Sequence, residues 1–175
     1  MTIPYRQRSV VAVDPTPRGI AYVFFENGEL LDCSQRSTTA EESTILAGVD
    51  EILDGCAADV LVIEDPDVSS TRRHPRMRHV LRLITTHVRK RGSPVVQVAR
   101  EEVRASWALL GATTKEAIAA AIAERYPLLA PFVPPPRKYP DSEDARVNLF
   151  DAASLALAVL DDPRSADSLA DVLAP

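Results

Sequence analysis

One stretch, residues 9–15 (SVVAVDP), constrains the fold of this chain more than any other. Small and β-branched apolar residues run without interruption into Asp14, which is typical of a strand buried on both faces. Pro15 cannot continue a central strand, so we expect the strand to end there. Asp14 then lies at the carboxyl edge of a buried strand, where open α/β sheets bind their ligands. A buried carboxylate needs a positive partner. This indicates a metal ion or a ligand, and a turn-starting Asp before a proline is the simpler alternative.

The composition is that of a globular protein. The 175 residues fit one domain with a full core, and 46% of them are hydrophobic. We find neither an apolar run long enough to span a bilayer nor a signal-peptide core. Cys33 and Cys56 lack metal-ligand spacing and are expected to be free thiols of a cytoplasmic protein. We predict a single domain over residues 1–175, with a proline-rich loop at about 131–142 and a short tail after 162.

The order of the expected elements indicates a mixed α/β sheet. Asn27-Gly28 is a strong hairpin signal, so the strands on either side of it should pair antiparallel. Thr39 with Glu42, and Thr113 with Glu116, are candidate capping boxes that open two helices. We predict strands at 9–14, 20–25, 29–34, 60–63 and 94–98. We predict helices that end at 55, cover 74–91, run from 113 to 127 and cover 145–160.

Acidic side chains occupy three special positions in this plan. Glu64 ends a second buried strand, and it should meet Asp14 at one sheet edge if the two strands are neighbours. Asp151 interrupts an apolar, alanine-rich helix surface, so it lies near the packed side of the final helix. Asp144 is seven residues earlier, about 20° away around the helix. The alternative for Asp151 is a helix acid paired with a basic residue.

Basic residues are concentrated in one part of the chain. The net charge of −5 argues weakly against a nucleic-acid partner, but residues 68–100 contain no acid, nine of the 20 Lys/Arg and all three His. The expected helix at 74–91 carries an arginine stripe about 120° from its apolar face. We interpret these guanidinium groups as phosphate contacts beside Glu64, and an ordinary solvated helix face is the alternative. The candidate contacts are Arg72, Arg73, Arg76, Arg78 and Arg82.

Together these residues resemble the RuvC-type branch of the RNase H-like nuclease superfamily, the Holliday junction resolvases, over roughly residues 9–160. The resemblance lies in Asp14-Pro15 followed by Ala21 and Tyr22, the acidic strand 62–64, the segments 97–104 and 111–116, and the motif 150–154 (FDAAS). Thr16 replaces the usual glycine of the family, and Ser154 stands where the family usually carries a fourth acid.

The resemblance implies an RNase H-like mixed sheet, with three antiparallel strands followed by two parallel strands, flanked by helices. It also implies a metal-dependent endonuclease that resolves Holliday junctions by paired nicks. Two Mg²⁺ or Mn²⁺ ions, which prefer oxygen ligands, would assist phosphodiester hydrolysis. In this scheme Asp14 bridges the ions, and Glu64 and Asp151 each hold one.

The resemblance leaves the fourth metal ligand open. We rank Asp144 first, and Asp65 or a water held on Ser154 are the alternatives. Lys115 stands at the position of a family DNA-contact lysine, although a solvated first-turn lysine is nearly as good an interpretation. The resembling resolvases are two-fold dimers, so we expect a homodimer on branched DNA. The helix at 74–91 is the candidate interface, unless its apolar stripe packs on the sheet.

Two other classes of function remain. The chain could be a non-catalytic RNase H-like module that binds nucleic acid or a partner protein, having lost activity with the fourth acid. An actin-like ATPase also opens with a hairpin after an Asp. That group needs Gly-rich phosphate loops and a much longer chain, so the six glycines and 175 residues here argue against it.

Overall fold

The computed structural model describes residues 8–68, 73–135 and 145–162. Its strands are β1 (Ser9–Thr16), β2 (Gly19–Glu26), β3 (Glu29–Ser37), β4 (Val60–Glu64) and β5 (Val95–Val98). They form one sheet in the order β3-β2-β1-β4-β5. β1 pairs antiparallel with β2, which pairs antiparallel with β3, whereas β4 lies parallel to both β1 and β5. The predicted mixed sheet is therefore confirmed.

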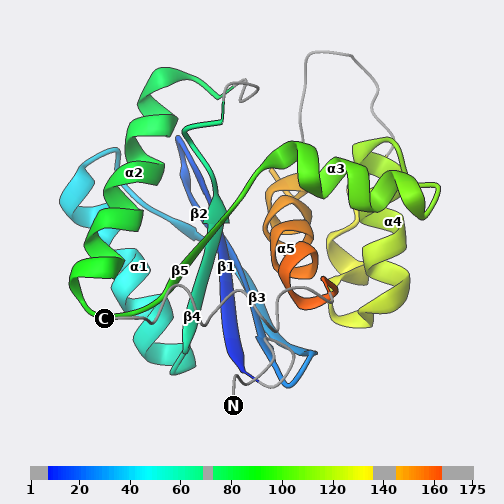
Figure 1. Cartoon of the computed structure of the whole chain (residues 1–175), viewed down its shortest axis with the longest axis horizontal. Coiled ribbons are helices and arrows are strands. Elements are labelled where there is room, and N and C mark those ends of the chain that lie inside the picture. The colour runs from blue at the N-terminus through cyan, green and yellow to red at the C-terminus, as the bar shows by residue number, and fades with distance from the viewer. Residues whose placement is uncertain (1–7, 69–72, 136–144, 163–175) are drawn as a thin grey trace.

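Helices cover both faces of this sheet (Figure 1). One face carries α1 (Glu42–Cys56) and α2 (Pro75–Lys90). The other carries α5 (Val147–Leu160), with α3 (Arg100–Leu109) and α4 (Lys115–Arg125) packed around it. None of the helices in the described residues combines the length and apolarity needed to cross a bilayer.

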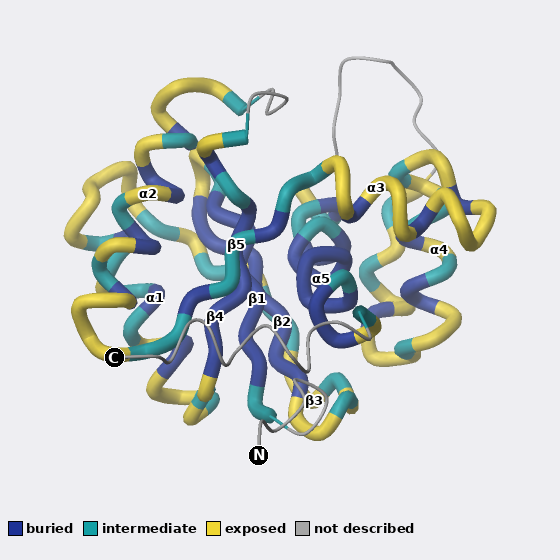
Figure 2. Tube along the Cα trace, viewed as in Figure 1, coloured by how far each residue is buried: buried dark blue, intermediate teal, exposed yellow. Residues whose placement is uncertain are grey.

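Alternate residues of the central strands face two separate hydrophobic cores. Val10 and Ala12 of β1 pack with α5, whereas Val11 and Val13 pack with α1 and α2. Figure 2 shows β1 and β4 buried along their length, as strands covered on both faces should be. Because side chains alternate along a strand, Asp14 projects on the same side as Val10 and Ala12, toward α5.

The small residues of α5 let this helix lie close against the sheet. Ala152, Ala153 and Ala156 are fully buried, and the helix is apolar around most of its circumference. A helix that is hydrophobic all round belongs in a core. Asp151 is therefore carried on an element whose position relative to β1 is fixed by packing.

The apolar stripe of α2 packs on its own sheet. Its five members lie in one core cluster with residues of β1, β4 and α1, so this stripe is not available to a second protomer. Of the two interpretations considered for residues 74–91, the crossover helix that packs on the sheet is correct. The stripe consists of Met77, Val80, Leu81, Ile84 and Val88.

Some predicted boundaries were wrong. Pro15 lies inside β1, which continues to Thr16 opposite β2. β4 pairs with β1 only as far as Ala12, so at Pro15 the ladder needs no N–H on that side. β3 also runs three residues beyond the predicted 34, because its pairing with β2 continues to the start of that strand, at Gly19.

Both predicted capping boxes were misplaced. α1 begins after Glu41, and no side chain caps it, so Thr39 lies outside the helix start. The cap of α4 is Thr114 rather than Thr113, and its hydroxyl accepts a hydrogen bond from the Ala117 amide at 3.1 Å. A 3₁₀ helix, η2 (Pro127–Phe132), occupies the start of the predicted proline-rich loop. Residues 136–144 of that loop lie outside the described part of the chain.

Candidate active site

Two buried carboxylates lie side by side at the carboxyl ends of β1 and β4. The strands are parallel neighbours, with Ala12 opposite Val62, and each acid follows two residues later. Asp14 and Glu64 are each only 1% exposed. The sequence therefore places both acids at the sheet edge where α/β proteins bind ligands.

Arg73 joins the two carboxylates. Its Nε donates to Glu64 Oε2 at 2.8 Å, and its Nη2 donates to Asp14 Oδ1. Its third donor, Nη1, reaches the carbonyl oxygen of Pro15 at 3.1 Å. Arg73 lies just before α2, near the beginning of the basic stretch 68–100, and its side chain is 15% exposed. One of the predicted phosphate contacts is thus bound to the acids themselves.

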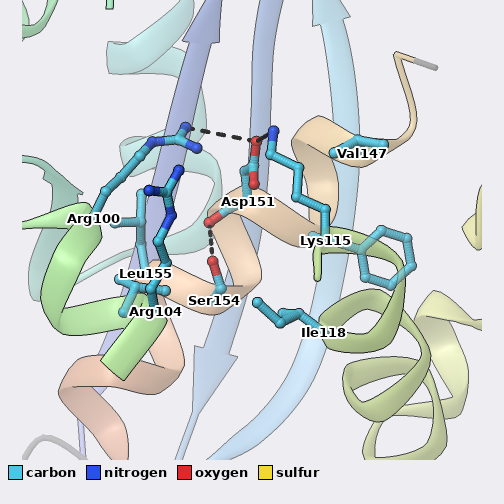
Figure 3. A pocket seen from close by; sticks show the side chains of 10 residues that line it. Arg100, Arg104, Lys115, Ile118, Val147, Asp151, Ser154 and Leu155 are labelled. Atoms are coloured by element: carbon cyan, nitrogen blue, oxygen red, sulfur yellow. Dashed lines mark hydrogen bonds and ion pairs between the residues drawn. The ribbon is translucent and has the colours of Figure 1, made fainter. Parts of the chain in front are cut away.

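Arg100 connects the same pair to Asp151 of α5, and Figure 3 shows its guanidinium group next to the Asp151 carboxylate. It is the first residue of α3, directly beyond β5. Its Nε donates to Glu64 Oε2 at 2.8 Å, and its Nη2 lies 3.7 Å from Asp14 Oδ1 and 3.6 Å from Asp151 Oδ2. The three acids predicted from the sequence therefore surround one guanidinium group. We call Asp14, Glu64 and Asp151 the acid cluster.

Asp151 also pairs with Lys115, whose Nζ lies 3.1 Å from its Oδ2. The alternative interpretation of Asp151, an acid paired with a base, is thus correct in part, but the pair belongs to the cluster. Ser154 donates its hydroxyl to the backbone oxygen of Asp151 at 2.8 Å. A small hollow of about 40 Å³ opens beside these side chains, and Arg100 and Arg104 also line it (Figure 3).

The electrostatics of the cluster follow from its burial. Burial raises the pKa of Asp14 to about 6; the charges of Arg73 and Arg100 oppose this rise, and that of Asp151 adds to it. Burial alone would lower the pKa of Arg73, but the carboxylates of Asp14 and Glu64 outweigh it and raise that pKa. The pKa of Arg100 is raised against its burial in the same way, with Asp151 the strongest of its carboxylates. The acids therefore hold both guanidinium groups firmly in the charged form.

The chain is similar to known proteins in its structure, and its sequence matches no family model and no curated protein. RuvC of Thermus thermophilus superimposes with a TM-score of 0.60 at 20% identity, over 86% of this chain and 92% of that one. RuvC of the same organism in complex with a Holliday junction substrate gives 0.59 at 17% identity, over 86% and 91% of the two chains.

A third structure, the yeast mitochondrial Holliday junction resolvase, gives a TM-score of 0.59 at 11% identity, over 90% of this chain and 80% of that one. The fold is the RNase H-like fold of RuvC. The acid cluster of this chain lies on that fold at the ends of β1 and β4 and on the last described helix.

Among the described residues, the predicted basic contacts on α2 do not bind the acid cluster; they contact residues of the neighbouring loops. Arg78 Nε donates to the Pro66 carbonyl oxygen at 2.9 Å, and Arg82 Nη2 pairs with Asp67 at 2.6 Å. Arg76 Nη2 reaches the carbonyl oxygen of Ala40 at 3.1 Å. These arginines hold loops around α2 in this structure. Two other predicted site residues, Arg72 and Asp144, lie outside the described residues.

The sequence interpretation missed Arg100 and Arg104 as site residues. Both belong to the segment that carried the resemblance, 97–104, but only its likeness to the family was used. The signal that could have found Arg100 is its position, two residues beyond the end of β5, the third of the parallel strands. Among the candidates for a fourth ligand, Asp65 accepts a hydrogen bond from the Asp67 amide at 2.9 Å, which closes a turn.

The donor set of the acid cluster suits divalent cations. Asp14, Glu64 and Asp151 offer carboxylate oxygens, the ligands that Mg²⁺ and Mn²⁺ prefer. Within the ranges that the structure describes, no three Asp, Glu, His or Cys side chains already converge as a metal site. Arg73 and Arg100 lie among the carboxylates instead. The residues fit such ions, and binding them requires the two guanidinium groups to move aside.

Proposed function

We propose that this protein is a Mg²⁺- or Mn²⁺-dependent endodeoxyribonuclease that hydrolyses phosphodiester bonds in branched DNA, resolving Holliday junctions by paired nicks. The observation that carries the proposal is the acid cluster. Three carboxylates from β1, β4 and α5 surround one guanidinium group, on a fold shared with RuvC. A buried cluster of acids with cations around it suits a substrate that brings metal ions and phosphate together.

The acids and the cations have separate tasks in this proposal. Asp14, Glu64 and Asp151 would hold two ions, which when bound supply an activated water and neutralise charge on the phosphate. Arg73 and Arg100 would leave the carboxylates and contact phosphate oxygens, which match the planar guanidinium fork. In the free protein the same two side chains neutralise the acids, so the buried carboxylates are never left without a partner.

Other basic residues belong to the proposed DNA surface. Lys115 and Arg104 line the hollow beside Asp151, where a phosphate next to the cleaved bond would lie. Arg72, Arg76, Arg78 and Arg82 remain predicted contacts for more distant parts of the substrate. The two thiols, Cys33 and Cys56, are free in the structure, and we include a cytoplasmic location in the proposal.

The fourth metal ligand is assigned to Asp144 as part of this proposal. Ser154 donates a hydrogen bond from its hydroxyl to the Asp151 carbonyl oxygen, and Asp65 accepts one that closes a turn, which favours Asp144 over both. Asp144→Asn should weaken Mn²⁺ binding measured by calorimetry. Unchanged titration curves would assign the fourth position to water or to another residue.

A homodimer follows from the proposed substrate. A four-way junction is close to two-fold symmetric, and a C₂ pair would present two acid clusters to strands of like polarity. The apolar stripe of α2 is buried in its own protomer, so the interface must use other surface. Sedimentation at micromolar concentration, with and without junction DNA, should show a dimer. A strict monomer under both conditions would remove the paired-cut mechanism.

Two observations favour a second function. The acid cluster is closed by arginines, and Ser154 replaces the fourth acid of the family. A catalytically weakened module that binds nucleic acid or a partner protein would show these features. It would bind Mn²⁺ or DNA without cutting any substrate.

A cleavage panel separates the two functions. End-labelled four-way junctions, flaps, linear duplexes and RNA–DNA hybrids are incubated with protein and Mg²⁺, Mn²⁺ or EDTA. The proposal expects metal-dependent cuts that are fastest in the junction and placed symmetrically in opposite strands. Binding without cleavage of any member supports the module instead.

A further inference from the structure

A second, larger hollow lies next to the acid cluster. Its volume is about 490 Å³, and none of the residues that line it is acidic. Arg73 is shared by the hollow and the acid cluster, because it lines the hollow while its guanidinium group binds Asp14 and Glu64. The proposed function gives this hollow no role. We call it the arginine hollow, lined among others by Arg18, Arg36, Arg73, Gln35, Ser37 and Asn148.

The backbone builds this hollow and fixes its arginines. β2 pairs with the end of β3, with Ile20 opposite Arg36 and Gly19 opposite Ser37. A Cβ atom on Gly19 would lie 2.0 Å from the Arg36 carbonyl oxygen, so only glycine permits this close approach. The Arg18 carbonyl oxygen accepts a hydrogen bond from the Thr38 amide at 3.3 Å. Arg18, in the turn between β1 and β2, is therefore held next to the end of β3, which carries Arg36.

The three arginines differ in how their charge is used. Arg18 is exposed, and its guanidinium group has no ion-pair partner among the described residues. Arg36 lies 6.0 Å from the centre of the Tyr22 ring and pairs with Glu51 at 2.7 Å. Arg73 is held by the acid cluster. Among the residues that the structure describes, the hollow therefore offers the unpaired charge of Arg18, and that of Arg73 as well once other cations neutralise the acids.

Polar side chains of α5 and β3 complete the lining. Asn148 is three residues before Asp151 and thus on the same side of α5, one turn earlier. Gln35 donates from its side-chain amide to the backbone oxygen of Ala145, just before that helix. The hollow thus begins beside the acid cluster and extends to the end of β3.

We propose that the arginine hollow is a second nucleic-acid subsite, which binds the sugar-phosphate backbone of the DNA strand beyond the cleaved bond. Arginine, amide and hydroxyl groups are the side chains that contact phosphate and sugar in protein–DNA interfaces. Arg100, Arg104 and Lys115 line the smaller hollow beside Asp151, so cations flank the acid cluster in two separate hollows. A strand crossing the cluster would meet cations before and after the reacting phosphate. The inference rests on the proposed function.

Salt-dependent binding tests the subsite. Dissociation constants of a fluorescent four-way junction are measured in EDTA from low to moderate salt, for wild-type protein and for Arg18→Ala and Arg18→Ala/Arg36→Ala. Each lost phosphate contact should reduce the slope of log K against log salt by about 1. We expect a slope smaller by about 1 for the single variant and by about 2 for the double variant.

Arg125→Ala is the matched control. Arg125 is 40% exposed and pairs with Asp161, as Arg36 is 39% exposed and pairs with Glu51. Arg125 is the last residue of α4, whereas Lys115, which pairs with Asp151 of the acid cluster, is the first. Substitution of Arg125 should leave the salt slope unchanged, and thermal unfolding should show that every variant is folded. If the Arg36 change unfolds the protein, the single Arg18 variant decides the matter.

The outcomes separate this inference from the proposed function. If both Arg18 variants bind like wild type while Arg104→Ala and Lys115→Ala bind more weakly, the subsite is refuted and the proposed function stands. If the wild-type protein binds no nucleic acid at all, the proposed function fails first. A slope reduced equally by Arg125→Ala would also refute the subsite, because the effect would then be one of total charge.

Discussion

Arginines at the acid cluster and arginines on the surface of α2 use the same functional group in two different environments. The side chains of Arg73 and Arg100 are 15% and 26% exposed, and they meet carboxylates that are 1–2% exposed. Arg82 is 48% exposed, and its partner Asp67 is 62% exposed. When a buried ion pair loses one partner, the remaining charge is left uncompensated. When an exposed pair loses one partner, water solvates the remaining charge. The first set should therefore control both stability and metal binding, and the second set should control neither.

The largest difference is expected in stability. Arg100→Ala should lower the free energy of unfolding by about 3 kcal/mol, because Glu64 and Asp14 lose a guanidinium partner in a buried site. Arg82→Ala should lower it by less than about 1 kcal/mol, as exposed pairs do. Denaturant unfolding at pH 7 in EDTA measures both. Equal losses in the two variants would show that the buried and the exposed ion pairs contribute equally to stability.

Arg100→Ala should lower stability but strengthen metal binding. Because the guanidinium group competes for the carboxylates, Arg100→Ala should bind Mn²⁺ about tenfold more tightly, or about 1.4 kcal/mol. Isothermal calorimetry on the free protein gives this affinity without any cleavage assay. Arg104→Ala is the control, since Arg104 lines the same hollow but pairs with no acid among the described residues. Weaker Mn²⁺ binding in Arg100→Ala would show that the arginine supports the ion rather than competing with it.

The smallest effect is expected in the surface network between α1 and α2. Although burial acts in the opposite direction, hydrogen bonds from His87 and Arg91 lower the pKa of Asp50 below its usual 3.8. A lowered folded-state pKa stabilises the protein above the unfolded pKa, and this contribution is lost as the pH falls through the folded value. Asp50→Asn should cost about 0.5–1 kcal/mol at pH 7, and this cost should shrink as the pH falls through the folded pKa of Asp50. Unfolding curves at several pH values give the difference, and a gap that grows on acidification would contradict the assignment.

Much of the fold could be predicted because its strands are locally encoded. Continuous apolar runs identify β1 and β4, and Asn27-Gly28 marks the hairpin between β2 and β3. The capping residues were harder to predict. Thr113 and Thr114 have the same side chain, and only the backbone conformation decides which of them caps α4. The helix α3 was not predicted as an element, because its buried face is short, with Val103 and Trp107 as its buried residues.

The acid cluster was predictable in part for the same reason. Asp14 and Glu64 follow buried strands, so the sheet brings them together once the strands are neighbours. The roles of the arginines could not be predicted in this way. Arg73 and Arg82 belong to one stretch without acids, and nothing local shows that the first faces Asp14 while the second faces Asp67. Arg73 precedes α2 and Arg82 lies within it, and sequence periodicity does not show which acid each of them reaches.

The central claim is that the acid cluster is a metal-dependent nuclease site. Asp14→Asn tests it most directly, because it removes one charge at nearly constant shape and leaves Arg73 and Arg100 paired with Glu64. Wild-type and variant proteins, matched by circular dichroism, are incubated with a labelled four-way junction and Mn²⁺. The account predicts junction cuts by the wild type and a rate lower by orders of magnitude in the variant. Cleavage by Asp14→Asn at the wild-type rate would contradict it.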